Sequence, residues 1–310
     1  MSAATKLAAF AATLAVLFGG GALAGGAVDL DRDGPAGPHG DAATAKTEGA
    51  DGAASEEHET QETNESAGHG GAAAAHPVRG LAVAENGLRV VVEDPELRRG
   101  RTEELRFRIV GGGGETVSDF DVEHTKRMHL IVARRDLTGF QHLHPRQEDD
   151  GSWRVRLRLA DAGSYRLFAD FTHEGEASTL ASDLRVDGAA DLVPVPAPAP
   201  VAVSDGGYDV RLEAGRARPG QEANLRFAIS RNGETVHTEP YLGAGGHLVA
   251  LREGDLAFLH VHPTDHGDEG AHDDGVGFAA TFPTEGRYRL FLQFKHDGRV
   301  QTVAFTQEVR

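Results

Sequence analysis

The chain has 310 residues, 39% of them apolar, which is enough for two domains with cores of their own. It has no cysteine, so disulfides, thiolate metal sites and cysteine nucleophiles are excluded, and any metal must bind through nitrogen or oxygen. The formal net charge of −17 argues against nucleic acid and anionic membrane surfaces as partners, because both require a basic face. Metal cations are more plausible partners, because a negatively charged protein attracts them.

Residues 1–24 are typical of a signal peptide or a membrane anchor. Lys6 precedes an apolar run from Leu7 to Phe18, and Ala22-Leu23-Ala24 supplies the small residues of a cleavage site. The uncharged stretch from Leu7 to Val28 also reaches the length that a membrane-spanning helix needs. We therefore expect the rest of the chain to lie outside the cytoplasm. It is either secreted or tethered to the membrane by this N-terminal segment alone.

Residues 25–78 contain almost no large apolar side chain, so they cannot bury enough surface to offset the entropy of ordering. We interpret them as a disordered acidic stalk, in which four histidines form part of a solvated tether. Residues 189–202 are rich in proline and predict an extended spacer between two domains. The stalk histidines are His39, His58, His69 and His76.

The segments on either side of the spacer, 79–188 and 203–310, are a duplication. Leu105-Arg106-Phe107 matches Leu225-Arg226-Phe227, and the run from Gly163 to Phe168 matches the run from Gly286 to Phe291. Each half shows short stretches with period-two alternation, broken by turn residues, and no sustained helical period. For the first half this pattern predicts strands near 88–93, 103–110, 117–123, 128–134, 140–144, 153–159, 164–172 and 178–186.

About eight strands in each half is the scale of an immunoglobulin-like sandwich. The run from Asp161 to Tyr165 resembles the tyrosine corner of that fold, where the phenol hydroxyl binds the backbone a few residues upstream. The sequence thus predicts an all-β chain with two tandem immunoglobulin-like β-sandwiches, and a cupredoxin-like sandwich fits the same pattern.

A pattern of four histidines occurs in both repeats. In each repeat, twelve residues separate the first histidine from the second, and one residue separates the second from the third. The fourth histidine follows two phenylalanines and precedes an acidic residue and a glycine. Because imidazoles are common ligands of transition metals, we predict a metal site in each repeat. The candidate ligands are His129, His142, His144 and His173 in the first repeat, and His247, His260, His262 and His296 in the second.

The predicted pairing of the strands indicates which of these histidines lie close together. If 128–134 and 140–144 form a hairpin, paired positions sum to 273, and His129 lies opposite His144. Opposed side chains stand about 4.5–5.5 Å apart at Cβ, and His142 shares a face with His144 because it lies two residues away. If 164–172 runs antiparallel to 128–134, its end carries His173 toward His129. His124 and His237 have no counterpart in the other repeat, and the sequence assigns them no role.

Neutral imidazoles with carboxylates nearby suit Cu²⁺, Zn²⁺ or Ni²⁺, and Cu²⁺ leads that order of affinity. We therefore expect copper, with zinc as the second choice. Cu⁺ binding by clustered methionines has no support, because the only methionines are Met1 and Met128. The expected role is to bind or buffer the ion.

The stretches from Met128 to Val132 and from Phe140 to Pro145 resemble exported bacterial proteins of the YtkA-like and CopC-like kind. The resemblance implies a small immunoglobulin-like or cupredoxin-like domain associated with copper outside the cytoplasm. CopC-type sites use the histidine at the mature N-terminus, whereas cleavage after Ala24 would leave Gly25. A copper site in this chain must therefore be built differently.

Two other interpretations remain open. The first is a non-catalytic exported module that binds another exported protein or a cell-surface component, with histidines that only pack or form hydrogen bonds. The second is a cupin-type metalloenzyme, for which Glu148 follows His144 at a suitable distance, although the glycine spacing differs and the second repeat has His266 instead of the acid. Motifs of common hydrolases and phosphate loops are absent from the sequence, so we expect no enzyme, although a redox metal could still support chemistry.

Overall fold

The computed structural model describes residues 78–259, 261–264 and 275–310. The predicted signal or anchor segment, the stalk up to residue 77, and His260 lie outside these residues. In the described part of the chain, no helix is both long and apolar enough to cross a bilayer.

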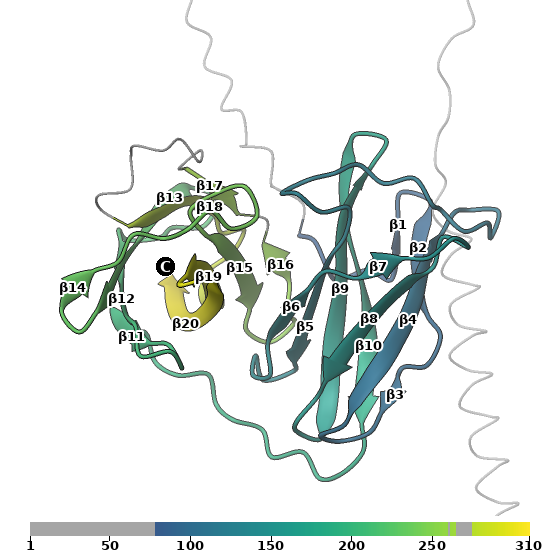
Figure 1. The fold of residues 1–310 in the computed structure, drawn as a ribbon, viewed down its shortest axis with the longest axis horizontal. Coiled ribbons are helices and arrows are strands. Elements are labelled where there is room, and N and C mark those ends of the chain that lie inside the picture. Colours follow the sequence, from purple (N-terminus) through teal and green to yellow (C-terminus); the bar gives the residue numbers. More distant parts are fainter. Residues whose placement is uncertain (1–77, 260, 265–274) are drawn as a thin grey trace, which may run out of the picture. The chain divides into compact units, whose positions relative to one another are not determined.

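The predicted all-β fold is confirmed, since each repeat is a sandwich of two sheets (Figure 1). One sheet of the first repeat has the order β1 (Ala84–Glu85), β2 (Leu88–Val92), β4 (Thr102–Val110), β8 (Trp153–Arg158) and β7 (Arg146–Gln147). The other has the order β3 (Glu96–Leu97), β10 (Glu176–Val186), β9 (Gly163–His173), β5 (His129–Arg134) and β6 (Gln141–Leu143).

The second repeat follows the same plan. Its first sheet has the order β11 (Val201–Val203), β12 (Asp209–Ala214), β13 (Glu222–Arg231), β18 (Val276–Thr281) and β17 (His262–Pro263), with β14 (Glu234–Thr235) paired to β13. Its second sheet has the order β16 (Phe258–Leu259), β15 (His247–Arg252), β19 (Gly286–His296) and β20 (Arg299–Val309). Strands β5 and β15 occupy equivalent places in the two repeats, as do β9 and β19, so the duplication seen in the sequence is also present in the fold.

Both repeats contain the tyrosine corner of an immunoglobulin-like sandwich. The Tyr165 hydroxyl donates a hydrogen bond to the Asp161 carbonyl at 2.9 Å, and the Tyr288 hydroxyl donates to the Thr284 carbonyl at 3.0 Å. Both tyrosines are buried. The corner predicted from the first repeat is therefore confirmed, and its counterpart is present in the second.

One predicted strand of the first repeat does not form. The segment 117–123 is irregular, with isolated bridges only at Thr116, just before it, and at Glu123. The Val117 amide binds the Ile109 carbonyl on one sheet, whereas the Asp121 amide binds the Thr172 carbonyl on the other. A segment that passes from one sheet to the other cannot build a continuous ladder with either of them, despite its alternating sequence.

The two repeats lie in one compact unit of the chain and share apolar contacts. All six residues of β5 are buried, which requires cover on both faces of the strand. Leu130 and Val132 face the core of the first repeat, while Ile131 and Ala133 face the second repeat. We call this shared cluster the inter-repeat core. Its buried members are Ile131, Ala133, Leu137, Phe168, Ala181, Val249, Leu251, Leu256, Phe258 and Phe291.

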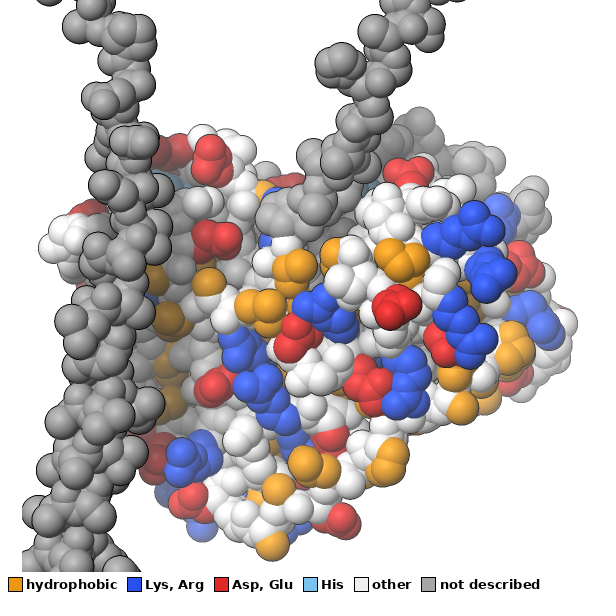
Figure 2. Space-filling view, turned by 180° about the vertical axis from the view of Figure 1, so that it is seen from behind, with side chains coloured by type: hydrophobic (Ala, Val, Ile, Leu, Met, Phe, Trp, Pro, Cys, Tyr) orange, Lys and Arg blue, Asp and Glu red, His pale blue; other side chains and the backbone are white. Residues whose placement is uncertain are grey.

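The spacer between the repeats is fastened to the first repeat. Arg134 and Asp136 form a buried ion pair at 2.6 Å, and Arg134 Nη2 also donates to the Asp191 carbonyl. The Val193 amide donates to the Asp136 carboxylate at 2.8 Å. Charged, uncharged polar and apolar side chains intermingle over the face of the molecule that Figure 2 shows.

Candidate metal centre

Three of the predicted ligands come from one β-hairpin of the first repeat. The chain turns after β5 and returns in β6 with Ile131 opposite His142. These positions sum to 273, so the predicted register is confirmed, and the same register extended by one pair sets His144 opposite His129. The ligand atoms of His129, His142 and His144 all lie within 4.8 Å of one another.

A chain of hydrogen bonds orients two of the three rings. His129 Nε2 lies 3.2 Å from the Glu123 carbonyl, and His142 Nδ1 lies 2.7 Å from Gln293 Oε1. Both partners are acceptors, so each of these nitrogens carries the proton of its neutral ring. The other nitrogens, His129 Nδ1 and His142 Nε2, then both present lone pairs, and they face each other at 3.0 Å. A proton shared in a hydrogen bond, or a metal ion, satisfies both nitrogens at this distance.

The His144 ring contributes a buried nitrogen close to the facing nitrogens of His129 and His142. His144 Nε2 is buried and has no hydrogen-bond partner among the described residues. The His144 ring centroid lies 4.8 Å from that of His142 and 5.1 Å from that of His129. An unpaired buried nitrogen costs free energy unless a ligand satisfies it.

Burial keeps these rings neutral. Desolvation, followed by the neighbouring His129 and His144, lowers the pKa of His142 to about 3. Desolvation also lowers the pKa of His144 to about 4, with further contributions from His129 and Lys126. Burial lowers the pKa of His129 as well. Protons therefore do not occupy the lone pairs at neutral pH, and the rings are in the form that binds metal.

A histidine of the second repeat lies against this group. The His247 ring centroid lies 4.7 Å from that of His142 and 5.7 Å from that of His129, and the planes of His247 and His129 differ by only 6°. His247 begins β15 as His129 begins β5, on the same face as Val249, which packs in the inter-repeat core. Burial and the neighbouring imidazoles lower the pKa of His247 well below its ordinary value.

His124, to which the sequence assigned no role, also belongs to this cluster. Its ring centroid lies 6.2 Å from that of His129 and 6.0 Å from that of His247. The residue sits in a turn with φ of 46°. Comparison of the repeats missed it because Leu242 occupies the equivalent turn in the second repeat. Its place five residues before His129 is the signal that could have found it. We call His124, His129, His142, His144 and His247 the histidine cluster.

Carboxylates lie on the far side of His129. Asp170 pairs with His129 across β5 and β9, and the Thr179 hydroxyl donates to its carboxylate at 2.6 Å. Burial raises the pKa of Asp170. The Glu123 carboxylate accepts a short hydrogen bond from the Thr172 hydroxyl. The centre thus consists of neutral imidazoles backed by acidic groups.

The structure places the fourth predicted ligand of each repeat away from the cluster. His173 lies three residues beyond Asp170 on β9, so its side chain points to the opposite face of the sheet. Its Nδ1 lies 2.8 Å from the Asp119 carbonyl. His296 holds the same place on β19, and its Nδ1 lies 2.9 Å from the Tyr208 hydroxyl.

The other two predicted ligands of the second repeat do not extend the group in the described residues. His262 is exposed on β17, which belongs to the sheet opposite β15. His260 lies outside the described residues. Among the described histidines of the second repeat, His247 alone reaches the cluster, so the residues expected to form a separate second site do not come together in the described part of the chain.

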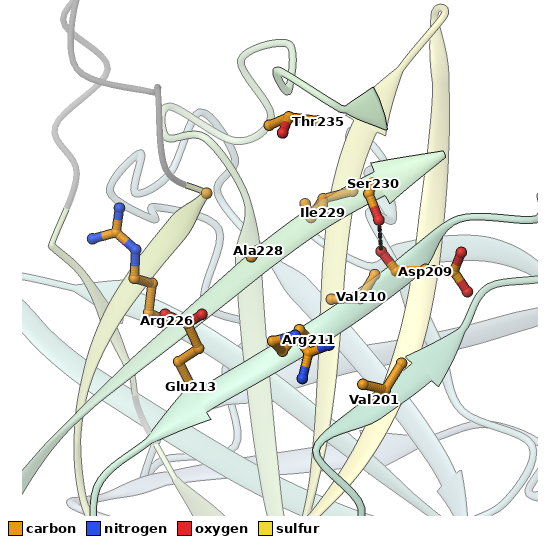
Figure 3. A pocket seen from close by; sticks show the side chains of 11 residues that line it. Val201, Asp209, Val210, Arg211, Glu213, Arg226, Ala228, Ile229, Ser230 and Thr235 are labelled. Atoms are coloured by element: carbon orange, nitrogen blue, oxygen red, sulfur yellow. Dashed lines mark hydrogen bonds between the residues drawn. The ribbon is translucent and has the colours of Figure 1, made fainter. Parts of the chain in front are cut away.

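The second repeat also has a cavity of about 610 Å³ on its first sheet (Figure 3). Side chains of both charges line it, including Asp209, Arg211, Glu213 and Arg226, and no histidine is among its lining residues. Ser230 Oγ donates to the Asp209 carbonyl at 3.4 Å at one side. This hollow is separate from the histidine cluster.

Solved structures that are similar to the chain include an adhesin, a titin tandem and fibronectin(III)-like modules. The Escherichia coli adhesin FdeC matches at 14% identity with a TM-score of 0.26. The match covers 74% of this chain and 66% of the FdeC chain, so it spans just under two thirds of that structure. A titin Z1Z2 tandem matches at 15% identity with a TM-score of 0.19, covering 72% and 99%. Fibronectin(III)-like modules of Clostridium thermocellum CbhA match at 10% identity with a TM-score of 0.20, covering 71% of this chain and 92% of the matched chain.

No curated protein matches the chain in sequence. One protein family does match, in two places that correspond to the two sandwiches, at residues 82–188 and 202–310. Together these segments cover more than half of the chain. The chain therefore belongs to the family described as a domain of unknown function, DUF8832, and carries two copies of that domain.

Proposed function

We propose that this protein binds a divalent transition metal outside the cytoplasm, through His129, His142 and His144, and holds or buffers that ion. Copper is the first choice and zinc the second. The extracytoplasmic location rests on the signal-like residues 1–24, and no catalytic role is proposed.

The observation that carries the proposal is the 3.0 Å approach of His129 Nδ1 to His142 Nε2. Two nitrogens bound to one ion at about 2.0–2.1 Å lie about 2.9 Å apart at a right angle and about 3.3 Å apart at a tetrahedral angle. The 3.0 Å separation of this pair lies between these two values. The buried Nε2 of His144 supplies a third donor within reach.

The choice of copper rests on ligand chemistry. A site made of imidazoles alone, without thiolate or clustered thioether sulfur, suits Cu²⁺ or Zn²⁺, and Cu²⁺ binds nitrogen ligands more tightly. The hairpin sequence resembles that of YtkA-like and CopC-like proteins, and this resemblance also favours copper. It is a hypothesis that rests on short motifs.

Titration calorimetry of the purified full-length chain with Cu²⁺ and with Zn²⁺ tests the proposal. The variant His142→Ala/His144→Ala should lose one tight equivalent that the parent binds. The matched variant His262→Ala/His296→Ala removes two histidines outside the cluster and should keep it. Equal binding by the parent and both variants would assign the metal to other histidines, such as those of the stalk, and sink the proposal.

A second candidate is a non-catalytic exported module that binds another protein or a cell-surface component. The observation in its favour is the pair of immunoglobulin-like sandwiches that dock through the inter-repeat core, with a hollowed outer sheet in the second repeat. In that case the hydrogen bonds of His129 and His142 serve only the structure. A titration without any tight metal equivalent would favour this candidate.

A further inference from the structure

We propose that the metal site spans both repeats, with His247 as a ligand from the second repeat, so that the bound ion clamps the two sandwiches together. This inference rests on the proposed function, since it concerns the same centre. It adds His247 as a ligand. It also predicts that the ion holds the two repeats together, which an ion bound only within the first hairpin would not do.

The first support is the position of His247 relative to the other rings. Its ring centroid lies closer to His142, at 4.7 Å, than those of His129 and His144 do, at 5.2 Å and 4.8 Å. An imidazole of the second repeat thus contacts the ring of His142, and it lies farther from His129, at 5.7 Å. The ring stacks on those of His142 and His129, so coordination of the ion by His247 requires a rotation of its side chain.

The second support is that the second repeat already orients a ligand of the first. Gln293 Oε1 accepts the hydrogen bond from His142 Nδ1, and Gln293 is buried on β19 directly opposite His247. The acceptor that leaves His142 Nε2 unprotonated therefore belongs to the other sandwich. Separation of the repeats would remove both this acceptor and the His247 ring.

The third support is the continuity of the cluster with the inter-repeat core. On β5, His129 shares a face with Ile131, and on β15, His247 shares a face with Val249. Both apolar residues pack in the inter-repeat core. The centre is therefore the polar end of the docking surface. An ion that binds only the docked form stabilises that form by mass action.

The test uses two changes that leave the hairpin histidines intact. His247→Ala removes the proposed fourth ligand, and Phe291→Ala weakens docking by removing the ring that stacks on Phe140. Each should lower Zn²⁺ affinity by about 10- to 100-fold, the scale seen when groups that support a metal site are lost. His296→Ala, a second-repeat histidine outside the cluster, is the matched control and should bind as the parent does.

The docking itself can be measured because the chain has no cysteine. Spin labels at Arg156→Cys and Arg211→Cys, both exposed and one in each repeat, report the distance between the sandwiches by pulsed electron resonance. Zn²⁺ is the probe because it is diamagnetic. In the Phe291→Ala background, Zn²⁺ should narrow the distance distribution, and adding His247→Ala should abolish the narrowing.

The outcomes separate this inference from the proposed function. Parental Zn²⁺ affinity in His247→Ala, or narrowing that persists without His247, would confine the ion to the first repeat and overturn the clamp while the metal site stands. Absence of Zn²⁺ and Cu²⁺ binding by the parent chain would overturn both.

Discussion

Phe140 of the first repeat stacks on Phe291 of the second, with ring centroids 4.0 Å apart and planes that differ by 5°. Their counterparts in the duplication, Phe258 and Phe168, meet at 5.7 Å. Phe140, just before β6, meets Phe291 on β19, and the equivalent phenylalanine Phe258 on β16 meets Phe168 on β9. Such reciprocal contacts are the pattern of a two-fold symmetric interface, here within a single chain. His129 and His247 are themselves equivalent positions, and their rings stack with centroids 5.7 Å apart.

The first prediction concerns this stack. Phe140→Ala should lower the free energy of unfolding by about 2–4 kcal/mol, because it removes a large apolar side chain from the inter-repeat contact. Urea unfolding measures the change, with Val122→Ala, at an exposed position, as the control. A loss within about 0.5 kcal/mol of the control would show that the stack does not hold the repeats together.

The second prediction concerns the tyrosine corners. Tyr165→Phe and Tyr288→Phe should each lower the free energy of unfolding by about 0.5–1.5 kcal/mol, because each removes the hydrogen bond from a buried tyrosine to a backbone carbonyl. The two changes lie in different repeats, so their effects should add within about 0.5 kcal/mol in the double variant. Thermal or urea unfolding of the three variants tests both statements, and a neutral double variant would contradict them.

The third prediction concerns acid stability at the spacer. Burial alone would raise the pKa of Asp136, but hydrogen bonds from Arg134, the Val193 amide and Thr138 lower it from 3.8 to about 2. A carboxyl with a lowered folded-state pKa stabilises the fold above its unfolded pKa of 3.8, and the contribution disappears as pH falls toward 2. It amounts to about 2 kcal/mol by the usual conversion.

Asp136→Asn should therefore lower the stability at pH 7 and flatten its pH dependence between pH 4 and 2, as followed by urea unfolding at each pH. The exposed Asp183→Asn, whose carboxylate also pairs with an arginine, is the control. An unchanged acid profile in Asp136→Asn would contradict the assignment.

The fourth prediction concerns the apo histidine cluster. Desolvation lowers the folded-state pKa of His142 from 6.5 to about 3, so the unfolded chain takes up its proton first as pH falls. Stability should therefore be insensitive to this group above pH 6.5 and should fall below it, by about 1.4 kcal/mol per pH unit. Urea unfolding of the metal-free chain at pH 7 and pH 5 measures the slope.

His142→Gln should remove about 2 kcal/mol of the difference between pH 7 and pH 5, because glutamine does not titrate. The exposed His262→Gln serves as the control and should keep the parental slope. Identical slopes in all three chains would show that His142 titrates alike in the folded and unfolded states.

The sequence by itself determined the local features of this protein. Period-two alternation located most of the strands of the first repeat. The bounds of the predicted strands 128–134 and 140–144 determined the hairpin register, because the short turn between them fixes which positions pair. The run before Tyr165 determined the tyrosine corner, since that bond spans only four residues.

Only the tertiary structure decided what lies on the second face of β5. Ile131 and Phe140 share the face of His129, and the sequence could not show whether solvent or another surface covered it. The cover is the second repeat, and it brings His247 and Gln293 to a hairpin more than 100 residues away along the chain. Contacts between folded domains depend on surfaces that exist only after each sandwich has formed, and no local spacing encodes them.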